Sequence, residues 1–318
     1  MNFLYISKNR SGLLNLDRNL SYLLKFIACI MVMMSHYSGY ALVSGLSSSI
    51  IYKGIAALCG YLGVAFFFFF SGYGLMKSDM KHHLSCFDFF KRRLAKTYLP
   101  AVLVSAIWLF VAILVNLDLL CNQHYLLGVI WQFNDEVLWF VRVIVLLYFC
   151  FFLYRLKFQD KSHRWLYLLL LTLLAYVFVR ITGIGSSLSV PIFFMGVFVA
   201  DYSELIKKRN VLSYKGGVIL AFLFLILLWF CKNDNYLLHG WINYLCIITF
   251  IFLIANFEIK IANVPQWIRD WSYNIYLVHW KVHLMILLCF QVNELWMFFI
   301  TVGIVTYLFS FVRKLLRI

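Results

Sequence analysis

The chain has little charge, and very little of one sign. Asp and Glu account for 13 of its 318 residues and Lys and Arg for 28, so charged residues make up only 13% of the sequence. Apolar residues make up 64%, whereas soluble domains are about 45–50% apolar. A water-soluble fold could not bury this much apolar surface, so the chain is predicted to lie largely in lipid. The basic excess is therefore interpreted as membrane topology rather than as nucleic-acid binding.

The sequence also lacks any CxxC pair among its eight cysteines. Most of the cysteines lie inside apolar runs, where a thiol acts as a small packing group. This pattern argues against a disulfide framework and a zinc site. His279 and His283 share a helix face, but no acidic or cysteine partner accompanies them, so no metal is predicted. No cleavable signal peptide is convincing, and the first apolar run is expected to remain as a signal anchor.

Apolar stretches long enough to cross a bilayer recur along the whole chain. A membrane helix needs about 17–25 mainly apolar residues. By this criterion we predict an all-α, polytopic helix bundle with about ten transmembrane helices. The predicted spans lie near residues 20–42, 54–76, 97–117, 135–154, 165–181, 187–201, 215–231, 239–256, 272–290 and 294–312. Pro100 and Pro191 are expected near helix starts, where proline is tolerated.

Basic residues gather on alternate loops between these spans. They are dense before the first span, at residues 77–96, 155–164, 207–215 and 260–269, and after residue 312, whereas the other loops carry only Lys53 and Lys232. The positive-inside rule then places both termini in the cytoplasm. We predict one membrane-embedded domain over residues 1–318, with a cytoplasmic N-terminal segment at 1–19 and a tail at 313–318. The expected location is the inner (cytoplasmic) membrane, as a multi-pass protein.

Two ionisable residues frame the apolar run KFIACIMVMMSH (25–36) in the first span. A charge at this depth costs about 2.5–3.5 kcal/mol on the gentlest insertion scale, so such residues usually mark a site. Eleven residues separate Lys25 from His36, which places both on one helix face about 16 Å apart. A cation at one end and an imidazole at the other would suit a ligand with an anionic head and a reactive tip. Snorkelling of Lys25 and a packing role for His36 are the structural alternatives.

Five stretches in order resemble the acyltransferase 3 family of integral-membrane O-acyltransferases. They are Lys25 and His36, with ten residues between them in the first helix, followed by FFFFFSGYGL (66–75), the basic loop FKRRLAKTYLP (90–100), LWFVR (138–142) and WSYNIYLVH (271–279). The resemblance covers nearly the whole chain. It implies transfer of an acyl group, most often acetyl, from cytoplasmic acyl-CoA to a hydroxyl of a cell-surface glycan or its precursor. The chain is expected to belong with the minimal members of the family, which have no extracytoplasmic domain appended after the last helix.

The resemblance also assigns roles to residues. His36 matches the essential histidine, as base or acyl acceptor, and Lys25 matches its basic partner, which holds the donor. Arg92 and Arg93 match the basic loop and suit the phosphates of acyl-CoA, while Ser71 and Gly72 would let the donor approach helix two. The acceptor is expected near Arg142, Trp139, Tyr276 and His279. Two alternatives stay open. Ser71 and Gly72 could serve only helix packing, and the two arginines could belong to an ordinary positive-inside loop.

Two other classes of function compete with the acyltransferase. A polytopic transporter would use Lys25, His36, Arg142 and His279 as an ion or proton pathway, although the absence of acidic residues at depth argues against a cation carrier. A membrane scaffold would not need ionisable groups on one internal face. The expected partners are membrane lipid, a surface polysaccharide or lipid-linked glycan and a second copy of the chain in a homo-oligomer, with no nucleic acid. Acetyl-CoA is the expected donor.

Overall fold

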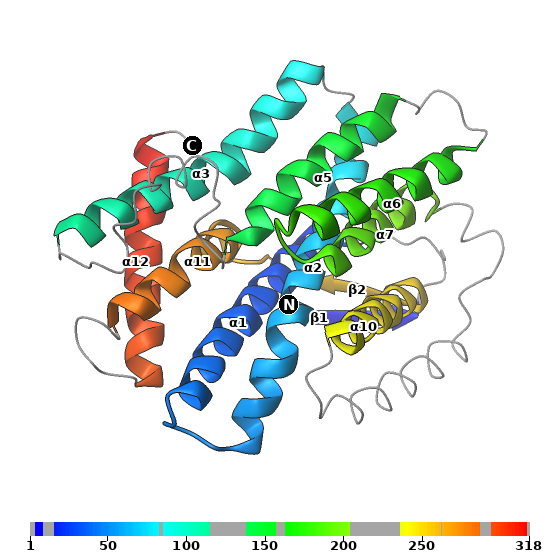
Figure 1. Ribbon diagram of the computed structural model, residues 1–318. Coiled ribbons are helices and arrows are strands. Elements are labelled where there is room, and N and C mark those ends of the chain that lie inside the picture. The colour runs from blue at the N-terminus through cyan, green and yellow to red at the C-terminus, as the bar shows by residue number, and fades with distance from the viewer. Residues whose placement is uncertain are drawn as a thin grey trace. The chain divides into compact units, whose positions relative to one another are not determined.

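The computed structural model (Figure 1) describes residues 4–8, 16–82, 85–114, 138–156, 163–203, 236–261, 263–286 and 294–316. It confirms the all-α class, since helices form almost all of these residues. They are α1 (Arg18–Val43), α2 (Ile50–His82), α3 (Cys86–Leu114), α5 (Trp139–Leu156), α6 (Arg164–Thr182), the 3-10 turn η2 (Ser187–Ser189), α7 (Val190–Asp201), α10 (Tyr236–Asn256), α11 (Gln266–Met285) and α12 (Leu295–Leu315).

Nine of the ten predicted spans coincide with described helices. Six of these helices are long and apolar enough to cross a membrane, and shorter apolar helices occupy 187–201 and 240–254. Helix α11 differs because it carries buried polar side chains, including Asn274, His279 and Lys281. The span predicted near 215–231 lies outside the described residues. Pro191, at the second position of α7, stands near a helix start as predicted.

Two helices begin or end well beyond their apolar runs. Helix α2 continues to His82, and α3 begins at Cys86 and contains the stretch predicted as a basic loop. Pro100 therefore lies inside α3, and the prediction that it marks a helix start is wrong. The hydropathy criterion missed these turns because they carry Lys and Arg, which are good helix formers outside lipid. Pro100 has no N–H to donate to the carbonyl of Lys96, so this helix lacks one backbone bond there.

A short two-stranded ribbon was not predicted. Strand β1 (Leu4–Lys8) pairs antiparallel with β2 (Phe257–Ile261), so that Leu4 stands opposite Ile261 and Lys8 opposite Phe257. The strands lie side by side in Figure 1. The pairing joins the N-terminal segment to the connection between α10 and α11. Positive-inside reasoning assigned both segments to the cytoplasmic side, and the ribbon agrees with that assignment.

The start of α1 is fixed to the same ribbon. Asp17 caps the helix through its side chain, which accepts a hydrogen bond from the Leu20 backbone N–H and another, at 3.5 Å, from that of Ile261. Asn19 donates from Nδ2 to the Ile261 carbonyl at 3.2 Å. The Leu16 N–H donates to the Tyr73 hydroxyl of α2. A capping carboxylate satisfies N–H groups that the first turn cannot pair internally. These contacts thus fix the first turn of α1 relative to β2 and α2.

Contacts divide the chain into two compact units, each built from two separate segments. The first unit comprises Met1–His82 and Pro191–Ser272, and the second comprises His83–Val190 and Tyr273–Ile318. Helix α11 contributes its first turns to the first unit and the remainder to the second. The prediction that residues 1–318 act as one domain stays a prediction.

Two glycines bring α2 and α7 into backbone contact within the first unit. A Cβ added at Gly72 would collide with the carbonyl oxygen of Phe193, and one added at Gly196 would collide with that of Phe69. The Phe66, Phe69 and Phe70 rings pack on Phe250 of α10 nearby. Small residues that let backbones approach are the usual basis of helix association in lipid. The SGYG stretch therefore has a packing role in this unit.

We predict that Gly72→Ala destabilises the protein while Gly74→Ala does not. The added methyl at residue 72 meets Phe193 backbone, and overpacking of this kind costs about 1–3 kcal/mol. At Gly74 the same methyl meets nothing within 4 Å. Thermal unfolding in detergent should show a lower midpoint for Gly72→Ala only. Equal midpoints for the two variants would contradict the close approach of α2 and α7.

Candidate functional site

Lys25 and His36 lie in one uninterrupted helix, α1, as the sequence predicted. Both side chains are half-buried. At about 100° per residue, Lys25, Cys29 and His36 fall within about 40° of one another around the helix axis. Cys29 is buried, with 1% of its surface exposed. These three residues define one stripe along α1, called here the Lys25–His36 stripe.

Helix α2 covers a neighbouring face of α1. A Cβ added at Gly63 would collide with the Ala28 carbonyl oxygen and would lie 2.7 Å from Val32 Cγ2. One turn further along α1, Ser35 Oγ donates to the Ala56 carbonyl at 2.9 Å. Around the helix axis, Ala28 and Ser35 lie about 60–80° from Lys25, and Val32 lies about 20° from it, at the edge of the Lys25–His36 stripe. The tight packing of α1 on α2 therefore fixes the direction in which the stripe faces.

The first turns of α11 cover α1 on the other side of the stripe. The Phe26 ring meets Trp267 edge to face, with ring centroids 5.5 Å apart. The Arg269 guanidinium lies over the Tyr22 ring at 6.0 Å. Tyr22 and Phe26 precede and follow Lys25 by one turn or less. Lys25 thus lies at a level of α1 where α2 and α11 flank its face, and the turn of α11 that precedes the WSYN stretch supplies one of the flanks.

Ser71 and Gly72 lie about two thirds of the way along α2 rather than near its end, because α2 extends to His82. The side of Gly72 that would carry a Cβ is filled by α7. This glycine is accounted for by helix packing, and its role in donor binding stays a prediction. Lys77, further along α2, donates to the Ser203 hydroxyl at 3.3 Å.

Arg92 and Arg93 differ in their surroundings on α3. Arg92 is exposed. Arg93 is half-buried, with its guanidinium 6.0 Å from the Phe89 ring centroid. Residue 93 shares a helix face with Thr97, one turn further on. Of the two, Arg92 is the arginine that a soluble anion can reach, and Arg93 belongs to the packing of the second unit.

A polar cluster in the second unit joins α3, α5, α11 and α12. The Tyr273 hydroxyl donates to the Thr97 carbonyl, and the Thr97 and Tyr148 hydroxyls lie 3.4 Å apart. Asn274 donates from Nδ2 to Ser310 Oγ at 2.7 Å, and its Oδ1 accepts from Arg313. In the sequence, Arg313 is one of the basic residues after the last predicted span, and the positive-inside pattern alone accounts for it. Nothing in its spacing could have shown the contact, because the two partners are 39 residues apart.

Tyr276 and His279 are buried together on α11. Tyr276 packs on Phe140 of α5 at 5.5 Å, and His279 lies 5.8 Å from the Tyr276 ring. His279 Nδ1 is 2.7 Å from the Tyr276 carbonyl oxygen. With only 1% of its surface exposed, His279 is held as a core histidine. Among the described residues, no group of three or more His, Cys, Asp or Glu could hold a metal ion.

Arg142 and Trp139 both support the connection after α6. Arg142 Nε donates to the Ile184 carbonyl at 2.9 Å. A Cβ at Gly185 would lie 2.7 Å from Trp139 Cε3 and 2.7 Å from Val143 Cγ2. The LWFVR stretch therefore has a positioning role in the second unit. The acceptor-binding role predicted for Arg142 and Trp139 stays a prediction.

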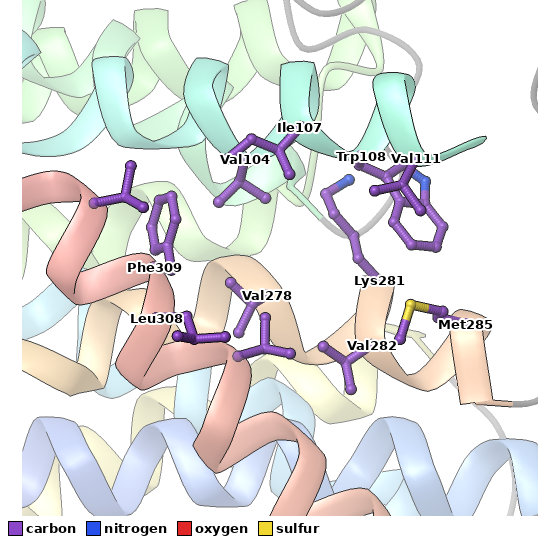
Figure 2. A pocket seen from close by; sticks show the side chains of 12 residues that line it. Val104, Ile107, Trp108, Val111, Val278, Lys281, Val282, Met285, Leu308 and Phe309 are labelled. Atoms are coloured by element: carbon purple, nitrogen blue, oxygen red, sulfur yellow. The ribbon is translucent and has the colours of Figure 1, made fainter. Parts of the chain in front are cut away.

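An apolar cavity of about 320 Å³ lies between α3, α11 and α12, all within the second unit. Figure 2 shows its lining, which includes Val104, Trp108, Val278, Lys281 and Phe309. The Lys281 ammonium is 5.9 Å from the Trp108 ring centroid. This cavity was not predicted from the sequence, although Lys281, a lysine inside an apolar run, was a signal that could have found it.

One comparison with known proteins gives a match. The family model for the acyltransferase domain of the acyltransferase 3 family matches residues 18–313. No curated protein and no solved structure matches the chain. The matched range holds every candidate residue described above, from Lys25 to His279. Because it covers nearly the whole chain, the protein belongs to the acyltransferase 3 family.

Proposed function

We propose that this membrane acyltransferase moves an acyl group, most often acetyl, from cytoplasmic acyl-CoA to a hydroxyl of a cell-surface glycan or its lipid-linked precursor. The observation that carries the proposal is the Lys25–His36 stripe on one face of α1, flanked by α2 and by the start of α11. Family membership favours an enzyme over the transporter that the same ionisable residues could also serve. The donor and the acceptor are inferred from the resemblance described above.

The proposed chemistry needs one basic nitrogen beside the reacting atoms. As a general base, His36 accepts the proton of the acceptor hydroxyl while the hydroxyl oxygen attacks the thioester carbonyl. The C–S bond breaks, an ester forms, and the proton passes to the CoA thiolate. As an acyl acceptor, the imidazole attacks the carbonyl first, the C–S bond breaks, and CoA leaves with the imidazole proton. The acceptor hydroxyl then attacks the acyl-imidazole, so that the ester forms and the imidazole regains a proton. In both routes a histidine serves well, because its ordinary pKa lies close to neutral pH.

Lys25 supplies positive charge about 16 Å from His36 along the same face. Lysine is a compact point charge that attracts an anion without fixing its orientation. The flanking rings of Phe26 and Trp267 restrict the space beside it. This arrangement suits the anionic part of an extended donor whose thioester reaches further along α1.

We predict that His36→Ala abolishes acyl transfer without unfolding the protein. Loss of a general base typically lowers a rate by about 10²–10⁴-fold. Acetyl transfer from radiolabelled acetyl-CoA measures the rate, and calorimetry measures donor binding, which should persist. His82→Ala, at the exposed end of α2, is the matched control and should keep full activity. Transfer by His36→Ala within a few-fold of the parent would remove His36 from the mechanism.

A second expectation concerns the charge at residue 25. Lys25→Arg should keep donor affinity, because arginine supplies the same charge with more donors. Lys25→Ala should weaken acetyl-CoA binding by about tenfold or more, as expected for a lost charge-assisted hydrogen bond. Titration calorimetry on the purified variants checks both. An unchanged affinity of Lys25→Ala for acetyl-CoA would contradict the proposal that Lys25 holds the donor.

The third expectation separates phosphate binding from topology at Arg92. If the exposed Arg92 binds the CoA phosphates, Arg92→Ala should raise the apparent dissociation constant of acetyl-CoA. It should not raise that of S-acetylpantetheine, which lacks the nucleotide. Arg93→Ala should also lower the thermal stability of the protein, which Arg92→Ala should not, because Arg93 packs on Phe89. Lys53→Ala, which removes an exposed lysine in the first turn of α2, on the opposite predicted side, is the charge-matched control. Equal loss with both donors in Arg92→Ala would favour a purely topological role.

A further inference from the structure

His36 lies between two residues of α1 that are in contact with α2. Ser35, directly before it, donates from Oγ to the Ala56 carbonyl at 2.9 Å. Tyr37, directly after it, is buried and packs on the Tyr52 ring, with ring centroids 6.3 Å apart. The strength of a hydrogen bond depends steeply on its angle, so the Ser35 contact restricts rotation of α1 about its axis. Because successive helix residues point about 100° apart, holding the neighbours of His36 also fixes its direction.

The hydroxyl of Ser35 occupies a notch in α2 at Gly60. A Cβ added at Gly60 would lie 2.7 Å from Ser35 Oγ and 3.2 Å from Ser35 Cβ. Both distances are shorter than ordinary van der Waals contact, which is about 3.5–4.0 Å between carbon atoms. A helical carbonyl points toward the residue four positions later, so the Ala56 acceptor and the notch are adjacent. A side chain at residue 60 would therefore displace the Ser35 hydroxyl from its acceptor.

Gly60 has a different task from Gly63, three residues further along α2. At Gly63 the space is taken by α1 backbone, the Ala28 carbonyl oxygen, so this glycine determines how closely the two helices approach. At Gly60 the space is taken by a side chain that is hydrogen-bonded to the same helix. Gly63 therefore fixes the distance between α1 and α2, and the Ser35 bond in the notch adds control of the rotation of α1.

We infer that Ser35 and Gly60 are positioning residues for acyl transfer, which together hold α1 at the rotation that directs His36 at the reacting atoms. The inference rests on the function proposed above for His36. Catalysis by this imidazole requires its nitrogen to lie within reaction distance of its target, and small misplacements are costly. Lys25 lies about 15 Å from Ser35 along α1, so donor binding should depend little on the contact at Gly60.

The test compares Ser35→Ala, Gly60→Ala and the double variant in acetyl transfer from radiolabelled acetyl-CoA by the full-length protein. Ser35→Ala removes the hydrogen bond and Gly60→Ala fills the notch, so both variants break the same contact. A misplacement of about 1 Å can lower a rate about a hundredfold, so a shift of a few tenths of an ångström should lower kcat about tenfold. The double variant should also lose about tenfold rather than a hundredfold, because the two changes remove one shared contact.

Two controls separate positioning from a loss of structure. Gly54→Ala changes another glycine of α2, where the added methyl meets nothing within 4 Å, and it should keep the parental kcat. Titration calorimetry should give every variant the parental affinity for acetyl-CoA, which shows that each variant is folded and that only kcat has changed. A variant that loses donor affinity together with kcat would make the contact a purely structural one.

Three results would overturn the inference. They are a parental kcat in either single variant, losses that multiply in the double variant, and a loss of donor affinity that accompanies the loss of kcat. These results differ from a failure of the proposed function. If His36→Ala transfers acetyl at the parental rate, the proposed function itself fails. If His36→Ala is inactive while Ser35→Ala and Gly60→Ala are fully active, only the positioning role fails.

Discussion

Lipid offers neither the backbone nor a charged side chain a hydrogen-bond partner, and the rest of this structure follows from that constraint. The backbone satisfies its hydrogen bonds internally by forming helices over almost all of the described residues. Because hydrocarbon does not drive helices together, association depends on close backbone approach and on polar contacts. The backbones approach closely where Gly63 meets Ala28 and where Gly72 meets Phe193. The polar contacts are those that Asn274 makes with Ser310 and Arg313.

The same constraint explains why polar residues concentrate on α11. Asn274, His279 and Lys281 are all buried there, and each has a described partner in a neighbouring turn or helix of the second unit. Asn274 bonds across to α12, His279 lies against a carbonyl of its own helix, and Lys281 lies over a ring of α3. A helix of this kind is too polar to be stable facing lipid. The polar residues of α11 therefore indicate that the helix makes contacts inside the protein. The hydropathy of α11 alone does not identify the partners in those contacts.

Hydropathy predicted the positions of the helices well because length and apolar content are local properties of the sequence. It failed at Pro100, since residues 86–96 continue α3 with charged side chains that a hydropathy window excludes. It also could not show that Gly72 meets Phe193, or that Arg313 reaches Asn274, because those pairs are far apart in the chain. The Lys25–His36 spacing was informative for the opposite reason: both residues lie on one helix, whose period is fixed.

The two lysines at depth, Lys25 and Lys281, have different surroundings. Lys25 lies half-buried on a stripe whose flanks are aromatic and tightly packed, and the stripe continues to an imidazole. Lys281 lines an apolar cavity, with an indole ring as its described neighbour. The period of α1 aligns Lys25 with a second ionisable group, whereas the side chains that line the cavity with Lys281 are aliphatic or aromatic. The arrangement of the neighbouring side chains, and not the ammonium itself, therefore distinguishes the two lysines.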